Sequence, residues 1–313
     1  MAEIFSSAVQ IPTYSGEIYG TFSYQTSDSR SVAVILLSDG GAIDRNGNSA
    51  DGFNQSYCLK GLAEELARFG ITSLRYDKRG IGLSELPTPY TEDLQLDDYV
   101  EDAVHCVHYL KNEMGFARVI IAGHGEGALV GMLAAQGAPV DAFISINATS
   151  KNAATLLQKQ LQKRLCDKLL RQASQIIQQL HEGCFVDAVP DAFASLFSHP
   201  IQPYLISLFK HEPSHEIRQL DIPILLLHGS RDLQVAYTDA SELKASATDA
   251  TLLYIDGMNH VLKQVNADSM MQLDYYRDPT IPVSKQLVVN MMAFIGKVLR
   301  KQPAAEHKQV LQV

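Results

Sequence analysis

The stretch RVIIAGHGEGALV, residues 118–130, decides the fold of this chain. A short apolar run rich in β-branched residues passes through alternating glycines into a helix-like segment, which predicts a strand, a sharp turn and a helix. Gly123 and Gly127 flank the turn, where the backbone and its neighbours come too close for a Cβ atom. The central residue of such a turn carries a nucleophile, and here it is Gly125. The pattern G-x-S-x-G is therefore complete except for the side chain that would do the chemistry.

The glycine spacing argues against a dinucleotide-binding loop. That loop has the pattern G-x-G-x-x-G after the first strand of its fold, with an acidic residue about 20 positions further on. The run at 123–127 is G-x-G-x-G, it lies well inside the chain, and no acidic residue ends a following strand at that distance. We therefore predict that no nucleotide cofactor binds here.

Composition and charge limit the class of protein. The chain has 313 residues, of which 46% are hydrophobic and 19% are charged, as expected for one large α/β domain with room for an insertion. The net charge of −9 and the absence of a basic run disfavour nucleic acid and anionic membranes as partners. The sequence shows neither an export signal nor an apolar stretch of 18 residues, so we expect a cytoplasmic protein without a membrane span. The four cysteines form no CxxC pair, and we expect them to be reduced.

The first part of the chain predicts a sheet with one antiparallel edge. Residues 3–12 and 17–25 alternate loosely and predict an edge hairpin that turns at residues 14–16. The continuous apolar run at 32–37 predicts a strand covered on both faces, and 71–76 predicts another. Helical patterns lie at 57–69 and 100–110.

After the turn at Gly125, the α/β alternation is interrupted once. A short strand is predicted at 141–146, and residues 151–220 then show a long helical stripe without a clear strand. We predict a helical lid at 151–220, although packing helices away from any site remain the alternative. Strands near 223–229 and 250–255 and helices near 237–246 and 284–299 complete the pattern. Residues 1–150 and 221–313 are thus predicted to form one α/β core, a mostly parallel twisted sheet with helices on both faces.

Three residues that each follow a predicted strand are candidates for one site. They are Gly125, Asp232 and His260, and the carboxyl ends of parallel strands meet at one edge of a sheet. Asp232 would hold the imidazole of His260 in one tautomer, and His260 would act as general base and then acid. Taken singly, Asp232 is equally well a helix-capping turn residue and His260 an ordinary loop histidine.

Four motifs carry a resemblance to a known family. They are DRNGN at 44–48, RYDKRGIGLS at 75–84, HGSRD at 228–232 and MNH at 258–260. Together with the turn at Gly125, the chain resembles the α/β-hydrolase superfamily, and within it bacterial esterase-like members. The resemblance implies a carboxylesterase that cleaves a small-molecule ester through a Ser-His-Asp triad and an acyl-enzyme, without a cofactor. It also implies an oxyanion hole built from the N–H groups of Glu126 and of Gly40 or Gly41.

The chain departs from that family at two positions. The serine corresponds to Gly125, and Asp39 stands in the oxyanion loop where a small residue is common. A metal set of His124, Glu126 and His260 has no support from spacing such as H-E-x-x-H, and we predict no metal.

Three interpretations of Gly125 remain open. In the first, the natural protein is a serine esterase and the glycine is an engineered, inactivating replacement. In the second, the glycine is native and the chain is a pseudo-hydrolase that binds an ester-like or acidic ligand or a protein partner. In the third, His260 activates water directly. For all of them the sequence predicts very slow ester cleavage, and it predicts that Gly125→Ser alone should give activity.

Overall fold

The computed structural model describes residues 3–13, 16–25, 30–84, 93–265 and 272–300. These residues form an eight-stranded sheet in the order β1-β2-β4-β3-β5-β6-β7-β8. The strands from β4 to β8 in that order pair in parallel, and β1 and β2 are antiparallel, as predicted. Their bounds are β1 Ile4–Thr13, β2 Gly16–Gln25, β3 Val32–Leu37, β4 Thr72–Tyr76, β5 Arg118–His124, β6 Ala142–Ile146, β7 Ile224–Gly229 and β8 Thr251–Ile255.

The predicted hairpin forms the edge of the sheet. Strand β1 pairs with β2 along its whole length, from Ile4 opposite Gln25 to Thr13 opposite Gly16. Residues 14–15 of the expected turn lie outside the described residues. Only β2 pairs onward, with β4, so the parallel part of the sheet begins one strand further in.

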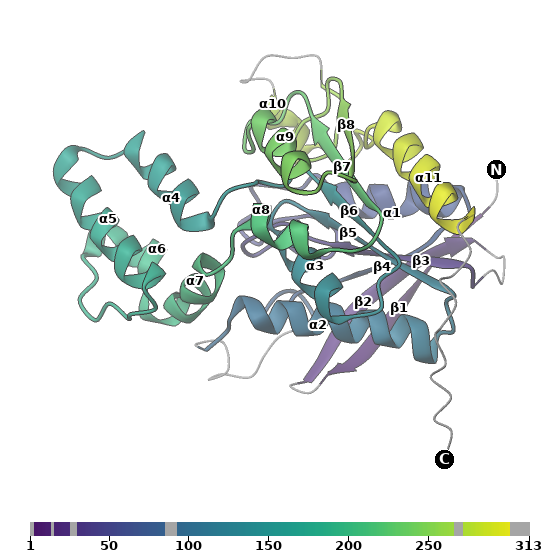
Figure 1. Cartoon of the computed structure of the whole chain (residues 1–313), viewed down its shortest axis with the longest axis horizontal. Coiled ribbons are helices and arrows are strands. Elements are labelled where there is room, and N and C mark those ends of the chain that lie inside the picture. The colour runs from purple at the N-terminus through teal and green to yellow at the C-terminus, as the bar shows by residue number, and fades with distance from the viewer. Residues whose placement is uncertain (1–2, 14–15, 26–29, 85–92, 266–271, 301–313) are drawn as a thin grey trace.

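Helices cover both faces of the sheet (Figure 1). On one face, α1 (Cys58–Arg68) and α11 (Lys285–Arg300) pack in one cluster with Val34 and Leu36. On the other face, α2 (Leu96–His108), α3 (Glu126–Gly137) and α9 (Tyr237–Ser246) pack with Ala33 and Ile35. Successive residues of β3 thus point into two different cores, which explains why the whole strand is apolar.

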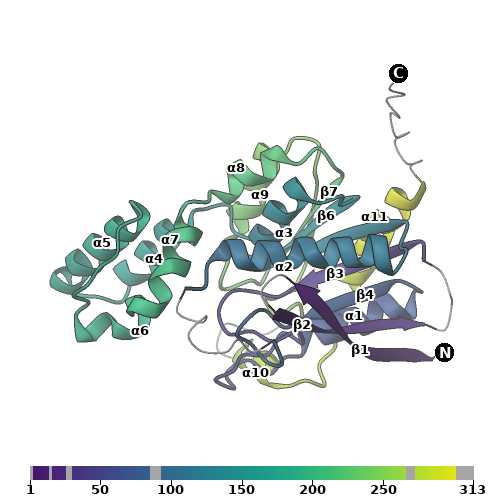
Figure 2. The same cartoon turned by 90° about the horizontal axis from the view of Figure 1, so that it is seen from below.

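The region between β6 and β7 is helical and contains no strand, as the stripe in the sequence predicts. Its helices are α4 Ala153–Gln162, α5 Asp167–His181, α6 Ala194–Phe197, α7 Gln202–Phe209 and α8 Pro213–Glu216. Both views show α4 to α7 projecting beyond the sheet as a lobe of their own (Figures 1 and 2). The lobe contacts the core at α2, where the N–H of Leu96 donates to Oγ of Ser207 at 2.8 Å.

Two further expectations concern helices and cysteines. Among the described residues, no helix combines the length and the apolar character that crossing a bilayer requires. All four cysteines are free: Cys58 and Cys106 are buried, whereas Cys166 and Cys184 are exposed. Burial raises the pKa of the Cys58 thiol to about 11.

Candidate functional site

The turn after β5 has the geometry that its glycines predict. Gly125 has φ 56° and ψ −123°, a conformation that residues with side chains rarely adopt. A Cβ atom on Gly123 would lie 2.4 Å from Cα of Ala128, and one on Gly127 would lie 2.4 Å from the carbonyl oxygen of Ser38. The strand and the helix therefore approach so closely that only glycine fits on either side of Gly125.

The structure brings Asp232 and His260 together at this turn. Nδ1 of His260 lies 2.8 Å from Oδ2 of Asp232, and both side chains are almost completely buried. The other oxygen of Asp232 accepts the N–H groups of Gln234 and Val235, so the carboxylate is fixed from both sides. The carbonyl oxygen of His260 accepts a hydrogen bond from Nδ2 of Asn147 at 3.1 Å, which holds the histidine loop against β6.

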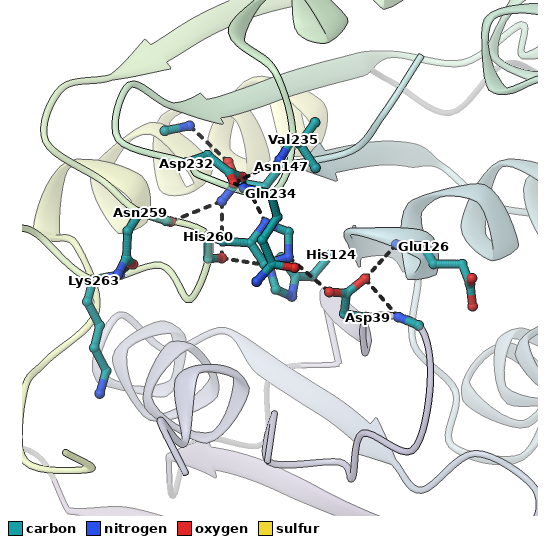
Figure 3. Close-up of polar contacts among 12 residues, drawn as sticks. Asp39, His124, Glu126, Asn147, Asp232, Gln234, Val235, Asn259, His260 and Lys263 are labelled. Atoms are coloured by element: carbon teal, nitrogen blue, oxygen red, sulfur yellow. Dashed lines mark hydrogen bonds and ion pairs between the residues drawn. The ribbon is translucent and has the colours of Figure 1, made fainter. Parts of the chain in front are cut away.

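Asp39 occupies the centre of the site (Figure 3). Its Oδ2 lies 2.9 Å from Nε2 of His260, on the side where the sequence analysis places the nucleophile. Its Oδ1 accepts the N–H of Glu126 at 2.9 Å and the N–H of Gly40 at 2.7 Å. Glu126 and Gly40 are the two expected oxyanion donors, and both point at the same carboxylate oxygen. For Gly41, the other candidate donor, the structure gives a carbonyl oxygen that accepts from Nζ of Lys78 at 2.7 Å.

The two departures from the family pattern belong to one arrangement. A Cβ atom on Gly125 would lie 1.9 Å from Oδ1 of Asp39, a separation that no pair of non-bonded atoms tolerates. The absent side chain at Gly125 therefore makes the room that the Asp39 carboxylate fills. The expectation that Gly125→Ser alone completes an active triad does not fit this geometry, because the serine would collide with Asp39.

The carboxylates determine the charge on His260. Burial by itself would lower its pKa, but Asp232 and, to a lesser degree, Asp39 raise it to about 10. Burial would likewise raise the pKa of Asp39, yet the hydrogen bond and the charge of His260 hold it far below its usual range. The site is thus a cationic imidazolium between two anionic carboxylates at neutral pH.

His124 and Glu126, which flank Gly125, point in different directions. The ring of His124 is 4% exposed, lies 4.7 Å from the ring of His260 between centroids, and bonds through Nε2 to the carbonyl oxygen of His260 at 2.8 Å. The carboxylate of Glu126 instead bonds with the hydroxyl of Tyr204 on α7. Burial raises the pKa of Glu126. Glu126 therefore does not lie in one group with the two histidines, the set for which the sequence offered no support.

The remaining motifs hold the loops around the site. Arg45 and Asp77, from the first two motifs, form an ion pair of 2.9 Å, and Asp77 also accepts the N–H of Leu83. Arg79 forms a buried ion pair with Asp102 of α2 at 2.6 Å. These contacts give Arg45, Asp77 and Arg79 a structural role.

A pocket of about 590 Å³ opens beside Asp39 and His260. Its wall also includes Gly40, Cys58, His124, Leu233, Gln234 and Tyr276 from the core. The helical region contributes Gln160, Lys163 and Arg164 from α4 and the residues after it. By contrast, Leu161 belongs to the hydrophobic core, and Leu157 and Leu165 pack against it. The part of the helical region that faces the pocket is therefore polar and positively charged.

The sequence analysis missed the position of Asp39. It identified Asp39 only as an unusual residue in the oxyanion loop. The signal that could have found it is that β3 and β5 are neighbours in the sheet, so the loops that carry Asp39 and Gly125 share one edge. A missing side chain in one of these loops and an added carboxylate in the other point to a compensating pair.

Comparisons with known proteins find one family model and one curated relative of similar sequence. A sequence model of the family described as "Serine aminopeptidase, S33" matches residues 51–196, which is less than half of the chain. Esterase EstD of Thermotoga maritima is 26% identical over 234 residues, which cover 74% of this chain. The same match covers 54% of that relative, so the chain spans about half of its length.

Solved structures show the same fold over nearly the full chain. An esterase of Pyrococcus furiosus has a TM-score of 0.59 at 16% identity and covers 95% of this chain and 92% of its own. Est1E of Butyrivibrio proteoclasticus has a TM-score of 0.56 at 15% identity and covers 92% and 99%. Proline iminopeptidase of Mycobacterium smegmatis has a TM-score of 0.58 at 14% identity and covers 94% and 99%. The chain therefore has the α/β-hydrolase fold.

Proposed function

We propose that this chain is a carboxylesterase-type hydrolase whose serine route is closed, so that the protein forms no acyl-enzyme and cleaves esters only very slowly. The observation that carries the proposal is the position of the Asp39 carboxylate, which bonds with His260 through Oδ2 and fills the oxyanion hole through Oδ1. Serine catalysis needs a neutral His260 as base and two free N–H donors for the substrate oxygen. The Asp39 carboxylate bonds with His260 and with both N–H donors, so none of these groups is free to act on a substrate.

The expected rate follows from the cost of losing a triad serine. That loss lowers kcat by about 10⁶ in a well-studied protease, so a typical kcat of ~10 s⁻¹ would fall to the order of 10⁻⁵ s⁻¹. The His260 imidazolium adds to this loss, because a protonated ring with a pKa of about 10 accepts no proton from water at neutral pH.

The test combines a covalent probe with an ester assay. A fluorophosphonate probe should leave the purified protein unlabelled, and p-nitrophenyl acetate should be cleaved at the rate of the His260→Gln variant. Labelling of the wild-type chain, or a kcat above ~1 s⁻¹ after active-site titration has excluded contaminating esterases, contradicts the proposal. Mass spectrometry of the labelled peptide would then identify the unrecognised nucleophile.

A non-catalytic binding role is the second candidate. It is supported by the pocket of about 590 Å³ that persists beside the closed site, with Lys163 and Arg164 on its rim. Because Asp39 already fills the oxyanion hole, a ligand carboxylate is better placed at these two cations than at the backbone donors. Thermal shifts with a series of carboxylic acids and their methyl esters would separate this role: stabilisation by the acids alone supports it.

A further inference from the structure

Three side chains at the closed site are arranged as a set of metal ligands. Asp39, His124 and His260 each offer one ligand atom, and these atoms all lie within 4.8 Å of one another. They come from the ends of three different strands, β3, β5 and β8, so no local spacing in the sequence reveals them. Two imidazoles and one carboxylate are a donor set that binds zinc in metalloenzymes.

The distances require little movement for an ion to bind. Zinc bonds of about 2.0–2.2 Å place neighbouring ligand atoms about 3–3.5 Å apart. Oδ2 of Asp39 and Nε2 of His260 are already 2.9 Å apart. The ring centroids of His124 and His260 lie 4.7 Å apart, and all three ligand atoms lie within 4.8 Å of one another, so the set closes on an ion by local movement of these side chains.

A second set of hydrogen bonds orients each of the three side chains. The other ring nitrogen of His260 bonds with Asp232, and that of His124 bonds with the carbonyl oxygen of His260. The second oxygen of Asp39 accepts two backbone N–H groups. A metal-binding histidine usually donates its other N–H to a carboxylate or a carbonyl, and ligating carboxylates are hydrogen-bonded in turn. Because the other nitrogen or oxygen of each side chain already has these partners, the atoms that would bind the ion are Nδ1 of His124, Nε2 of His260 and Oδ2 of Asp39.

The ligands border the pocket, which gives an ion a path and room for water. All three line it, whereas the side chains of His124 and His260 are otherwise almost completely buried. A catalytic zinc site keeps such an open position for water or substrate beside its three protein ligands.

We propose that Asp39, His124 and His260 bind one divalent transition-metal ion of the zinc type. The ion takes the place of the proton that His260 shares with Asp39, so that metal and proton compete for the same nitrogen. This inference rests on the proposed function in one respect, since both assign the Asp39 carboxylate to the centre of the site.

The test measures metal binding and not activity. We would use the Cys166→Ser/Cys184→Ser background, because the two exposed cysteines could bind zinc elsewhere. After chelation and dialysis, zinc is titrated calorimetrically, and retained metal is counted after gel filtration. We expect one ion per chain, and at least a tenfold loss of affinity in Asp39→Asn and in His124→Gln. We also expect zinc affinity to fall about 10–100-fold in Asp232→Asn, which removes only the carboxylate that orients His260.

Matched controls replace exposed residues of the same types. His181→Gln on α5 and Asp274→Asn on α10 (Gln272–Arg277) should bind zinc as the background protein does. A second measurement needs no variant at the site: cobalt added to the background protein should develop visible d–d absorption of a low-symmetry site, and zinc should abolish it.

Two results would overturn the proposal. One is an uptake of less than about one zinc ion per ten chains, or no cobalt spectrum, in the folded background protein. The other is equal zinc affinity in the background protein, Asp39→Asn and His124→Gln. Neither result bears on the closed serine route, whose own test is probe labelling of the metal-free protein, so the two proposals can fail separately.

Discussion

The side chain of Asp39 and a side chain at position 125 exclude each other, because Oδ1 of Asp39 lies 1.9 Å from where a Cβ on Gly125 would be. The same oxygen accepts the N–H of Glu126, directly after Gly125. A change at either position therefore acts on the other, and both must be varied together to test the site.

Restoring the serine should require two substitutions. Gly125→Ser alone should fold with a loss of stability of about 1–3 kcal/mol, since its φ of 56° is strained for serine and Asp39 must move. It should remain unlabelled by a fluorophosphonate. Asp39→Gly/Gly125→Ser removes the collision and frees both oxyanion donors, so it should be labelled and should cleave p-nitrophenyl acetate at least ~10³-fold faster than wild type.

The controls for this experiment are Asp39→Gly alone and the double variant with His260→Gln. Both should stay inactive, because the first has no hydroxyl and the second has no base. Labelling of Gly125→Ser alone would mean that Asp39 leaves the site freely, and the exclusion argument would be wrong. Urea melts of all four proteins establish that each is folded.

Asp39→Asn should lower the pKa of His260. The value of about 10 is raised first by Asp232 and then by Asp39, so removing the charge of Asp39 takes away the smaller of two contributions. Asp232→Asn should lower it further than Asp39→Asn does. Titration of the imidazole by NMR in metal-free protein checks both the direction and the order; an unchanged pKa in Asp39→Asn would show that the two groups are not paired in solution.

The paired histidine should make the folded protein less stable in alkali. The pKa of His260 is about 10 in the folded state and about 6.5 in an unfolded chain, so the folded state binds the proton more tightly. Its contribution to stability is complete below about pH 6.5 and is lost as the pH rises towards 10. Denaturant unfolding of the metal-free protein between pH 6 and pH 10 should show this decline, and Asp39→Asn should show a smaller one.

Lys78 should anchor the loop that carries Asp39. Its buried ammonium donates to the carbonyl oxygens of Asp39 at 2.6 Å and of Gly41 at 2.7 Å. Lys78→Met leaves both carbonyls without this donor, and we expect a loss of about 2–3 kcal/mol in urea unfolding. Exposed Lys60→Met is the matched control and should change stability by less than ~0.5 kcal/mol. A similar stability of the two variants would show that the loop is held by other contacts.

The positive rim of the pocket should favour acidic esters. In the serine-restored double variant, Lys163→Gln/Arg164→Gln should raise KM several-fold for an ester with a carboxylate on its acyl chain and leave KM for a neutral ester unchanged. Lys159→Gln on α4, which ends just before these two residues, is the control, since Lys159 does not line the pocket. An equal change for both esters would remove the helical region from substrate recognition and favour simple packing helices.

Much of the fold could be predicted, because the local sequence patterns match the strands and helices of the structure. The apolar run at 32–37 is β3 residue for residue, and the helices expected at 237–246 and 284–299 are α9 and α11 to within one residue. The helix expected at 100–110 differs: α2 starts earlier, at Leu96, and continues as a π-helical turn, Tyr109–Glu113. The buried residues Leu96 and Tyr99 extend the apolar stripe by one turn, so this earlier start was present in the pattern and was missed.

The site residues could be predicted only where the position of a strand is enough to place the residue at the edge of the sheet. Asp232 and His260 lie in the loops after β7 and β8, so parallel topology brings them together. The role of Asp39 depends on how far its side chain reaches across from the loop after β3 into the space beside Gly125. The tertiary contacts of its carboxylate with His260 and Glu126 hold it there, and periodicity and motif spacing do not describe them.

The collision between side chains at positions 39 and 125 also affects the order in which these two positions can be substituted. A serine at 125 is compatible with aspartate at 39 only if the Asp39 side chain leaves its observed position, whereas glycine at both positions leaves an open space. A path of single substitutions between this chain and a form with serine at 125 and a small residue at 39 therefore avoids the collision only if it passes through a form that has neither the hydroxyl nor the carboxylate. Such an intermediate keeps the strained turn, His260 and Asp232. One further substitution then gives either the aspartate at 39 or the serine at 125.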